Sequence, residues 1–383
     1  MSVTAAKGFR AAGIAAGIKQ NGNPDLALVV NDGPRRAAAA VFTANRVKAA
    51  PVLWSEQVMK SGQVSAVVLN SGGANACTGP KGFQDTHATA EKAGEALGRG
   101  AIEVAVCSTG LIGTLLPMDK VLPGIETAAA QLSEHGGEKA AIAIKTTDTV
   151  HKTSVVTQDG WTVGGMAKGA GMLAPGLATM LVVITTDADV DDATLDKALR
   201  AATRVTFDRV DSDGCMSTND TVLLLSSGAS GTTPDYDTFA DAVRQVCADL
   251  GRQLIGDAEG ASKDIKVEVV NAASEADAVE VGRSIARNNL LKCAIHGEDP
   301  NWGRVLSAIG TTGAVFEPDR LGVAINGVWV CKNGSVGEDR DLVDMRYREV
   351  HIVADLAAGT ETATIWTNDL TADYVHENSA YSS

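Results

Sequence analysis

The chain of 383 residues has few aromatic side chains and lacks the patterns that mark common metal and redox sites. Aromatic residues make up only 4% of it, so its core must be built mainly from Ala, Val, Ile and Leu. The six cysteines are widely spaced without a C-x-x-C pair, and the six histidines include no H-E-x-x-H. We therefore expect no metal, and we expect reduced, mostly buried thiols.

Signatures of nucleotide binding and of a nucleophile elbow are missing too. The sequence contains no G-x-x-x-x-G-K-[ST], no G-x-S-x-G, and no G-x-G-x-x-G between a strand and a helix. The segment QLIGDA (253–258) matches the Q-x-x-G-x-A pattern with which acyl-CoA-binding acetyltransferases hold pyrophosphate. An anion-binding loop should precede a helix, whereas this segment follows a helical stretch and precedes a strand-like one. We interpret it as a chance match.

A basic surface and a membrane segment are also absent from the sequence. The formal net charge is −14 and Lys and Arg form no stripe, which argues against nucleic acid as a partner. The apolar stretch 11–18 ends at Lys19 and is too short for a signal peptide or a membrane span. We expect a cytoplasmic protein without membrane contact. A small anionic substrate stays compatible, since it needs only one or two local cations.

Short β-rich runs alternate with amphipathic helical segments along the chain, as in a mixed α+β sandwich. The composition, 45% hydrophobic and 21% charged, is that of a globular protein with two or three subdomains. The predicted strands are 64–70, 103–109 and 180–186, with a C-terminal sheet around 321–356. The predicted helices are 85–97, 191–203 and 236–254, the last with an apolar face formed by Phe239, Val243, Val246, Leu250 and Leu254.

Four turns that combine glycine with hydroxyl or amide side chains are the candidates for a site. They are LNSGGANACTG (69–79), CSTGLIG (107–113), KTTDT (145–149) and the segment before Thr179. Turns of this kind aim backbone N–H groups and hydroxyls into a cleft, which is what an oxyanion site requires.

Thr179 lies between a Gly/Pro-rich lead-in and an apolar, β-branched run that starts at Met180. The local pattern alone predicts an ordinary threonine at the start of a strand. We also hypothesise that the Gly/Pro-rich lead-in holds the backbone before Thr179 in a strained geometry.

Taken together, several segments closely resemble the ornithine acetyltransferase family, also called ArgJ or glutamate N-acetyltransferase. They are AKGAGMLAPGLATML, CSTGLIG, TTDT, EGASK, HGEDPNWGR and the terminal YVHENSAYSS. The resemblance runs in family order from GFRAAGIAAGIK to the last residue, and the K-G-x-G-M…P…A-T-M-L block is highly specific. It implies an ArgJ/DmpA-like N-terminal-nucleophile architecture, an α+β sandwich with helices outside stacked sheets.

The resemblance also implies that the protein cuts itself between Ala178 and Thr179. Residues 1–178 would form an α chain with the oxyanion hole and substrate-binding loops. Residues 179–383 would form a β chain whose C-terminal tail completes the site, in an α2β2 heterotetramer. Thr179 would be the nucleophile and its freed α-amine, with an ordinary pKa of about 7.7–8, the general base.

Further roles follow from the same resemblance, residue by residue. The oxyanion hole would consist of the Thr109 hydroxyl and the Gly110 N–H. Taken singly, Lys168 is a solvated loop lysine, Glu259 a helix-end charge, and the tail a frayed end. The resemblance instead implies a tail docked in the site and a substrate-binding set of Thr146, Lys168, Thr179, Glu259, Asn378 and Ser383.

The implied reaction is a ping-pong transfer of acetyl from N2-acetyl-L-ornithine to L-glutamate through acetyl-Thr179, a step of arginine biosynthesis that needs no cofactor. Some family members also use acetyl-CoA as a co-substrate, and no motif here separates the two kinds. Two other functions stay open. One is a self-processing amidohydrolase or aminopeptidase that uses water as acceptor, and the other is a non-catalytic binding protein.

Overall fold

The computed structural model describes residues 2–174 and 180–380, which form two compact units. The first unit holds the chain up to Asp208 together with Cys215–Asp257, and the second holds Arg209–Gly214 and the chain from Ala258 onward. Both combine helices and strands, so the predicted α+β class is confirmed.

A four-stranded sheet forms one half of the first unit, in the order β1-β2-β4-β5. Its strands are β1 (Phe9–Ile14), β2 (Leu26–Asn31), β4 (Ala66–Asn70) and β5 (Val104–Ser108). Only the β4–β5 pair is parallel. The helices that pack against this sheet are α1 (Ala50–Val58), α2 (Gly79–Leu97), α3 (Met118–Ala130) and α4 (Gly137–Ala143).

A five-stranded sheet forms the other half, in the order β3-β9-β8-β7-β6. Its strands are β3 (Ala38–Phe42), β6 (Lys152–Gln158), β7 (Trp161–Lys168), β8 (Leu181–Thr186) and β9 (Thr221–Ser226). Helices α5 (Asp192–Val205) and α6 (Tyr236–Gly256) pack against it.

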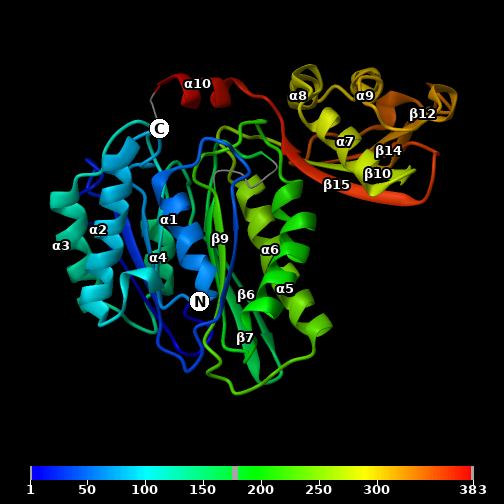
Figure 1. Cartoon of the computed structure of the whole chain (residues 1–383). Coiled ribbons are helices and arrows are strands. Elements are labelled where there is room, and N and C mark those ends of the chain that lie inside the picture. Colours follow the sequence, from blue (N-terminus) through cyan, green and yellow to red (C-terminus); the bar gives the residue numbers. More distant parts are fainter. Residues whose placement is uncertain (1, 175–179, 381–383) are drawn as a thin grey trace. The chain divides into compact units, whose positions relative to one another are not determined.

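The two sheets of the first unit share one hydrophobic core, with helices on the outside (Figure 1). This core joins Leu28 and Val67 of the four-stranded sheet to Met166, Val183 and Leu223 of the five-stranded one. The expected sandwich of stacked sheets flanked by helices is therefore confirmed. All six residues of β8 are buried, because this apolar, β-branched strand has neighbours on both edges and both faces.

The helix predictions hold, with one boundary error. The five apolar residues predicted for one face of α6 are all buried, and Asp235 caps that helix by accepting from the Thr238 N–H. Helix α2 begins at Gly79 rather than at residue 85, with a proline in its first turn. Proline is common in the first turn of a helix. The glycines in this stretch are weak helix formers, so the sequence pattern did not reveal where α2 starts.

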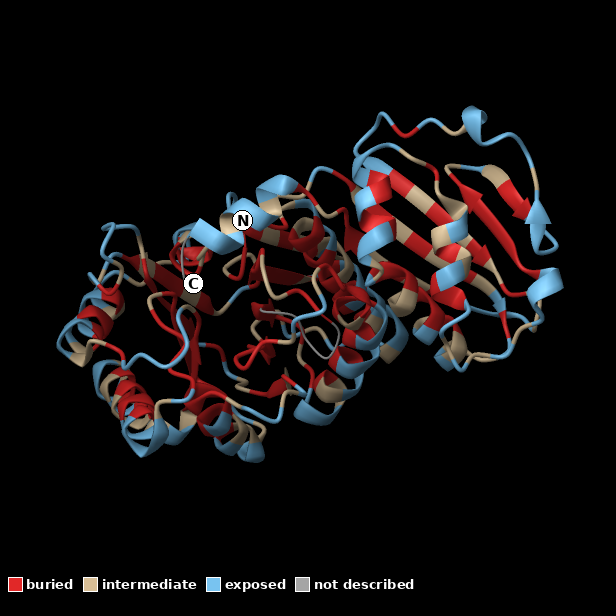
Figure 2. Ribbon diagram, turned by 90° about the horizontal axis from the view of Figure 1, so that it is seen from above, coloured by how far each residue is buried: buried red, intermediate tan, exposed pale blue. Residues whose placement is uncertain are grey.

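The second unit is built on a six-stranded sheet in the order β13-β12-β11-β14-β10-β15. The strands are β10 (Asp264–Ala272), β11 (Gly322–Ile325), β12 (Val328–Lys332), β13 (Ser335–Val336), β14 (Glu349–Asp355) and β15 (Glu361–Asn368). Burial alternates along β10, β14 and β15, as expected when one face meets a core (Figure 2). The unit's helices are α7 (Glu275–Ala286), α8 (Asn289–His296), α9 (Trp302–Ile309) and α10 (Ala372–Ala380).

Three further outcomes concern the sequence predictions. The C-terminal sheet is confirmed, although β10 and β15 were not predicted to join it. Cys107, Cys247 and Cys331 are buried while the other three cysteines are exposed, so the expectation of mostly buried thiols is half right. The predicted junction at 178–179 lies outside the described residues. In the described part of the chain, no helix has the length and apolarity needed to cross a membrane.

Candidate active site

Strand ends from both sheets of the first unit bring the hydroxyl-bearing turns together. Lys168 ends β7 and is paired with Leu181 at the start of β8, which is paired in turn with Thr221 at the start of β9. In the other sheet, Asn70 and Ser108 end the parallel strands β4 and β5. Three of the four candidate turns, those that contain Asn70, Ser108 and Lys168, thus begin at strand ends. The fourth, 145–149, joins them through the bond from the Gly169 N–H to Asp148.

Asn219 ties the two sheets together at this point. Its side-chain nitrogen donates to the Ala74 carbonyl (2.6 Å) and to the Ser108 carbonyl (2.8 Å). Because Asn219 is itself buried just before β9, these bonds fix the turn after β4 and the end of β5 against the start of β9.

Thr109 and Gly110 offer two donors side by side after β5. Thr109 is buried, and its hydroxyl accepts from the Lys168 Nζ at 3.3 Å, which leaves the hydroxyl proton for another acceptor. Gly110 has a φ of +130°, and a Cβ there would lie 2.8 Å from the Gly73 nitrogen, so only glycine fits. Among the residues described, the Gly110 N–H has no acceptor. The two groups have what an oxyanion hole requires.

Asp148 organises the neighbouring segments of the site. Its Oδ1 accepts from the Lys152 Nζ and from the Gly169 N–H, each at 2.6 Å, and its Oδ2 accepts from the Thr146 N–H at 3.0 Å. One carboxylate therefore orients Thr146 and the end of β7 that carries Lys168.

A buried ion cluster surrounds Asp148. The Lys152 side chain is 0% exposed and bridges Asp148 and Asp257, with 2.6 Å to a carboxylate oxygen of each. Burial alone would raise the pKa of Asp148, but Lys168, Lys152 and the Gly169 N–H together lower it to about 2. Asp148 is thus ionised at neutral pH, and the cluster is held by its charges.

Asp220 is a second buried acid at the same end of the sheet. Its Oδ1 accepts from the Met180 N–H at 3.1 Å, and its Oδ2 has no hydrogen-bond partner in the described part of the chain. Burial raises the pKa of Asp220 well above its usual range, against the lowering effect of the Met180 N–H, the Ser217 hydroxyl and Lys168.

The sequence did not single out four residues of this site: Asp148, Lys152, Asp220 and Asn219. The available signal was a charged residue at the edge of an apolar strand, as with Lys152 at the start of β6 and Asp220 directly before β9. Such residues are equally common as solvated strand ends, so the signal is weak.

The remaining predicted site residues lie elsewhere or outside the described residues. Glu259 is buried between α6 and β10, and Asn378 is exposed on α10, where its side chain donates to the Tyr374 carbonyl. Both belong to the second unit. Ala178, Thr179 and Ser383 lie outside the described residues. The QLIGDA segment ends α6 and precedes a strand, as predicted, so it has no helix to present to a pyrophosphate.

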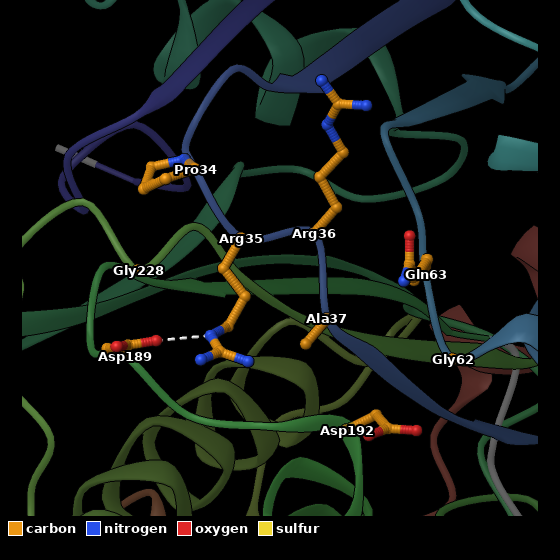
Figure 3. A pocket seen from close by; sticks show the side chains of 9 residues that line it. All are labelled: Pro34, Arg35, Arg36, Ala37, Gly62, Gln63, Asp189, Asp192 and Gly228. Atoms are coloured by element: carbon orange, nitrogen blue, oxygen red, sulfur yellow. Dashed lines mark hydrogen bonds and ion pairs between the residues drawn. The ribbon is translucent and has the colours of Figure 1, made fainter.

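A cavity of about 580 Å³ lies at the opposite end of the five-stranded sheet (Figure 3). It is lined by residues that follow β8 and β9, among them Asp189 and Gly228, and by Arg35 and Arg36 before β3. The Arg35 guanidinium is already paired with Asp189, and Arg36 lies 3.6 Å from a Glu103 oxygen. None of the predicted site residues lines this cavity.

At one end of the sandwich, buried charges lie beside two adjacent groups that can donate hydrogen bonds, an arrangement suited to an enzyme site. The chain belongs to the ArgJ family, whose model matches residues 10–383. It is 87% identical to the arginine biosynthesis bifunctional protein ArgJ of Streptomyces coelicolor over 383 residues, and 64% identical to that of Thermobifida fusca over 382, with 100% of each chain covered. A solved structure of ornithine acetyltransferase from Mycobacterium tuberculosis, complexed with ornithine, is 60% identical over 47% of this chain and 96% of that one, with a TM-score of 0.45.

Proposed function

We propose that the protein transfers the acetyl group of N2-acetyl-L-ornithine to L-glutamate in arginine biosynthesis, after cutting itself between Ala178 and Thr179. The observation that carries the proposal is the ArgJ match across nearly the whole chain, and the contact between the Lys168 ammonium and the Thr109 hydroxyl supports it. The word bifunctional in the names of the relatives favours a second activity, for which we propose acetylation of glutamate from acetyl-CoA. The reaction needs no other cofactor.

In the first half-reaction, the Thr179 hydroxyl oxygen attacks the acetyl carbonyl while the Thr179 α-amine takes the hydroxyl proton. The negative charge that develops on the carbonyl oxygen is stabilised by the Thr109 hydroxyl and the Gly110 N–H. The acetyl–nitrogen bond then breaks, and ornithine leaves with the proton returned from the amine. The enzyme keeps the acetyl group as an ester of Thr179.

In the second half-reaction, the α-amine of glutamate attacks the ester carbonyl and the same two donors stabilise the charge. The bond from the carbonyl carbon to the Thr179 oxygen breaks, the Thr179 α-amine passes the proton lost by the glutamate nitrogen to that oxygen, and N-acetylglutamate leaves. Both substrates carry an α-carboxylate and an α-nitrogen, so a single set of groups can orient both.

Lys168 is the proposed partner of that α-carboxylate, with Thr146 beside it. Lys168 is buried, and Asp148 lowers the cost of its charge. An ammonium shielded from water attracts a carboxylate more strongly than an exposed one. Glu259, Asn378 and Ser383 complete the proposed substrate-binding set, with Glu259 facing the δ-ammonium of ornithine. If Glu259→Gln leaves the KM for N-acetylornithine unchanged, that role of Glu259 is wrong.

The proposed partners are the two chains of one precursor, which stay together and pair as α2β2 in the cytoplasm. A size measurement of the purified protein beside a denaturing gel tests this assembly. One band, or a single αβ pair in solution, would contradict it.

The self-cleavage is tested by a denaturing gel with sequencing of the N-termini. We expect two bands, one of which starts at Thr179, and a single uncut band for Thr179→Ala. Thr157→Ala, an exposed threonine on β6, serves as the matched control and should be cut normally. An uncut Thr179→Ala protein that still transfers acetyl groups would defeat the mechanism.

The acceptor is tested by incubating the protein with N-acetylornithine, with and without glutamate. Transfer predicts that ornithine release depends on glutamate and that N-acetylglutamate forms in equal amount. If free acetate accumulates instead and glutamate has no effect, the protein is the self-processing amidohydrolase that uses water.

A further inference from the structure

Met180 is held at both of its backbone groups by the start of β9. Its carbonyl accepts from the Thr221 N–H at 3.1 Å, and its N–H donates to the Asp220 carboxylate at 3.1 Å. Met180 directly follows Thr179, so this N–H belongs to the peptide group that also contains the Thr179 carbonyl. The bond to Asp220 therefore fixes the peptide nitrogen that directly follows the proposed nucleophile.

An aspartate is an unusual residue at this position if its bond to the Met180 N–H has only a structural role. The Asp220 side chain is completely buried beside the hydroxyls of Ser217 and Thr43, and among the described residues its second oxygen receives no hydrogen bond of normal geometry. The hydroxyl of nearby Thr43 donates to the Ser217 carbonyl at 2.7 Å instead. A neutral amide or hydroxyl could accept from Met180 without the cost of burying an acid. Asn219, the preceding residue, is such a neutral amide, and it holds the same turn by donating to the Ala74 and Ser108 carbonyls.

We propose that Asp220 is a positioning residue for the self-cleavage and the acetyl transfer, acting through the peptide group of Met180. The inference rests on the proposed function. Asp220 lies at the same end of the sheet as Lys168, because Lys168, Leu181 and Thr221 are paired across three neighbouring strands. Its carboxylate therefore constrains the start of β8 from the side opposite to Lys168.

This role predicts that stability and activity respond in opposite directions to Asp220→Asn. The substitution keeps an oxygen that can accept from Met180, but a neutral amide holds that N–H less tightly than a carboxylate does, so the peptide group of Met180 is less firmly fixed. Burial raises the pKa of Asp220 above its ordinary 3.8. The fold therefore loses stability as the pH rises from the ordinary pKa through the raised one, because the buried carboxyl group then ionises. At pH 8 the variant should therefore melt at or above the temperature of the wild type. Its rate of cleavage, and the kcat of any cleaved protein, should fall at least ten-fold with little change in KM.

The matched control is Asp187→Asn. Asp187 is also a buried acid, at the opposite end of β8, and it accepts from the Lys7 N–H (3.0 Å) and the Thr162 N–H (2.7 Å). We expect it to change stability while cleavage and kcat stay within two-fold of the wild type.

The wild type is measured first for cleavage and for glutamate-dependent transfer. If it does neither, the proposed function fails, and the role of Asp220 fails with it, before any variant is compared. If the wild type does both while Asp220→Asn cleaves and turns over at wild-type rates, only the role of Asp220 is refuted. The role of Asp220 would also be refuted if cleavage and kcat fell in both variants only in proportion to the fraction of protein that stays folded.

Discussion

Replacing Lys152 by methionine is the sharpest test of the ion cluster in the first unit. The methionine fills much of the same volume but leaves the carboxylates of Asp148 and Asp257 without the ammonium between them. Their side chains are 0% and 7% exposed, so water cannot replace the lost partner. Breaking a buried pair by removing one partner costs about 3–5 kcal/mol.

In a folded unit of this size, 1 kcal/mol corresponds to about 2–4 °C, so the melting temperature should fall by about 6–20 °C. Thermal unfolding at pH 7, followed by circular dichroism, measures the change. The control is Lys92→Met, which removes an ion pair with Glu126 whose side chains are 27% and 59% exposed. That loss should be much smaller, because water and salt screen an exposed ion pair.

Adding Asp257→Asn to Lys152→Met should recover part of the stability, since it removes one of the two unpaired charges. The reasoning is refuted if Lys152→Met melts within 2 °C of the wild type, or if Lys92→Met is equally damaging.

Three further predictions concern the site and the core. The folded-state pKa of Asp148, about 2, lies below its ordinary 3.8, so the ionised form stabilises the fold above about pH 4 and that contribution is lost as the pH falls through about 2. Urea unfolding should show the stability difference between wild type and Asp148→Asn constant from pH 7 to 5 and shrinking toward pH 2. Thr109→Val should lower kcat by about 10²–10³-fold, while Thr109→Ser retains most activity in the transfer assay. Gly13→Ala places a Cβ 2.0 Å from a backbone carbonyl of α4 and should cost about 1–3 kcal/mol in urea unfolding, whereas Gly100→Ala, 3.8 Å from its nearest neighbour, should not.

The local pattern of the sequence was enough to predict the elements that form the sandwich. Strand β8 follows from its β-branched run, and α6 follows from five apolar residues at spacings of three and four. The order of the strands was not predictable, because β3 pairs with β9 across about 180 residues that separate them in sequence. No local pattern specifies such a pairing.

The same limit applies to the site. The contact between Thr109 and Lys168 joins residues 59 positions apart, and it was anticipated only through the family resemblance. The bridge from Lys152 to Asp257 spans 105 positions, so the burial of these charges depends on tertiary packing. Asp220 looks like an ordinary acid before a strand until the parallel pairing of β8 and β9 brings it to Met180.

The strand order of the five-stranded sheet has a consequence for how a cleaved protein would unfold. Strands β3, β6 and β7 precede the bond at 178–179, whereas β8 and β9 follow it and lie between them. The two polypeptides would be interleaved within one hydrogen-bonded sheet and one core, so neither could keep its fold alone. Unfolding would release two molecules from one, and refolding would require them to meet again. The melting temperature of the cut protein should then rise with protein concentration, whereas that of uncut Thr179→Ala should not depend on the concentration in this way.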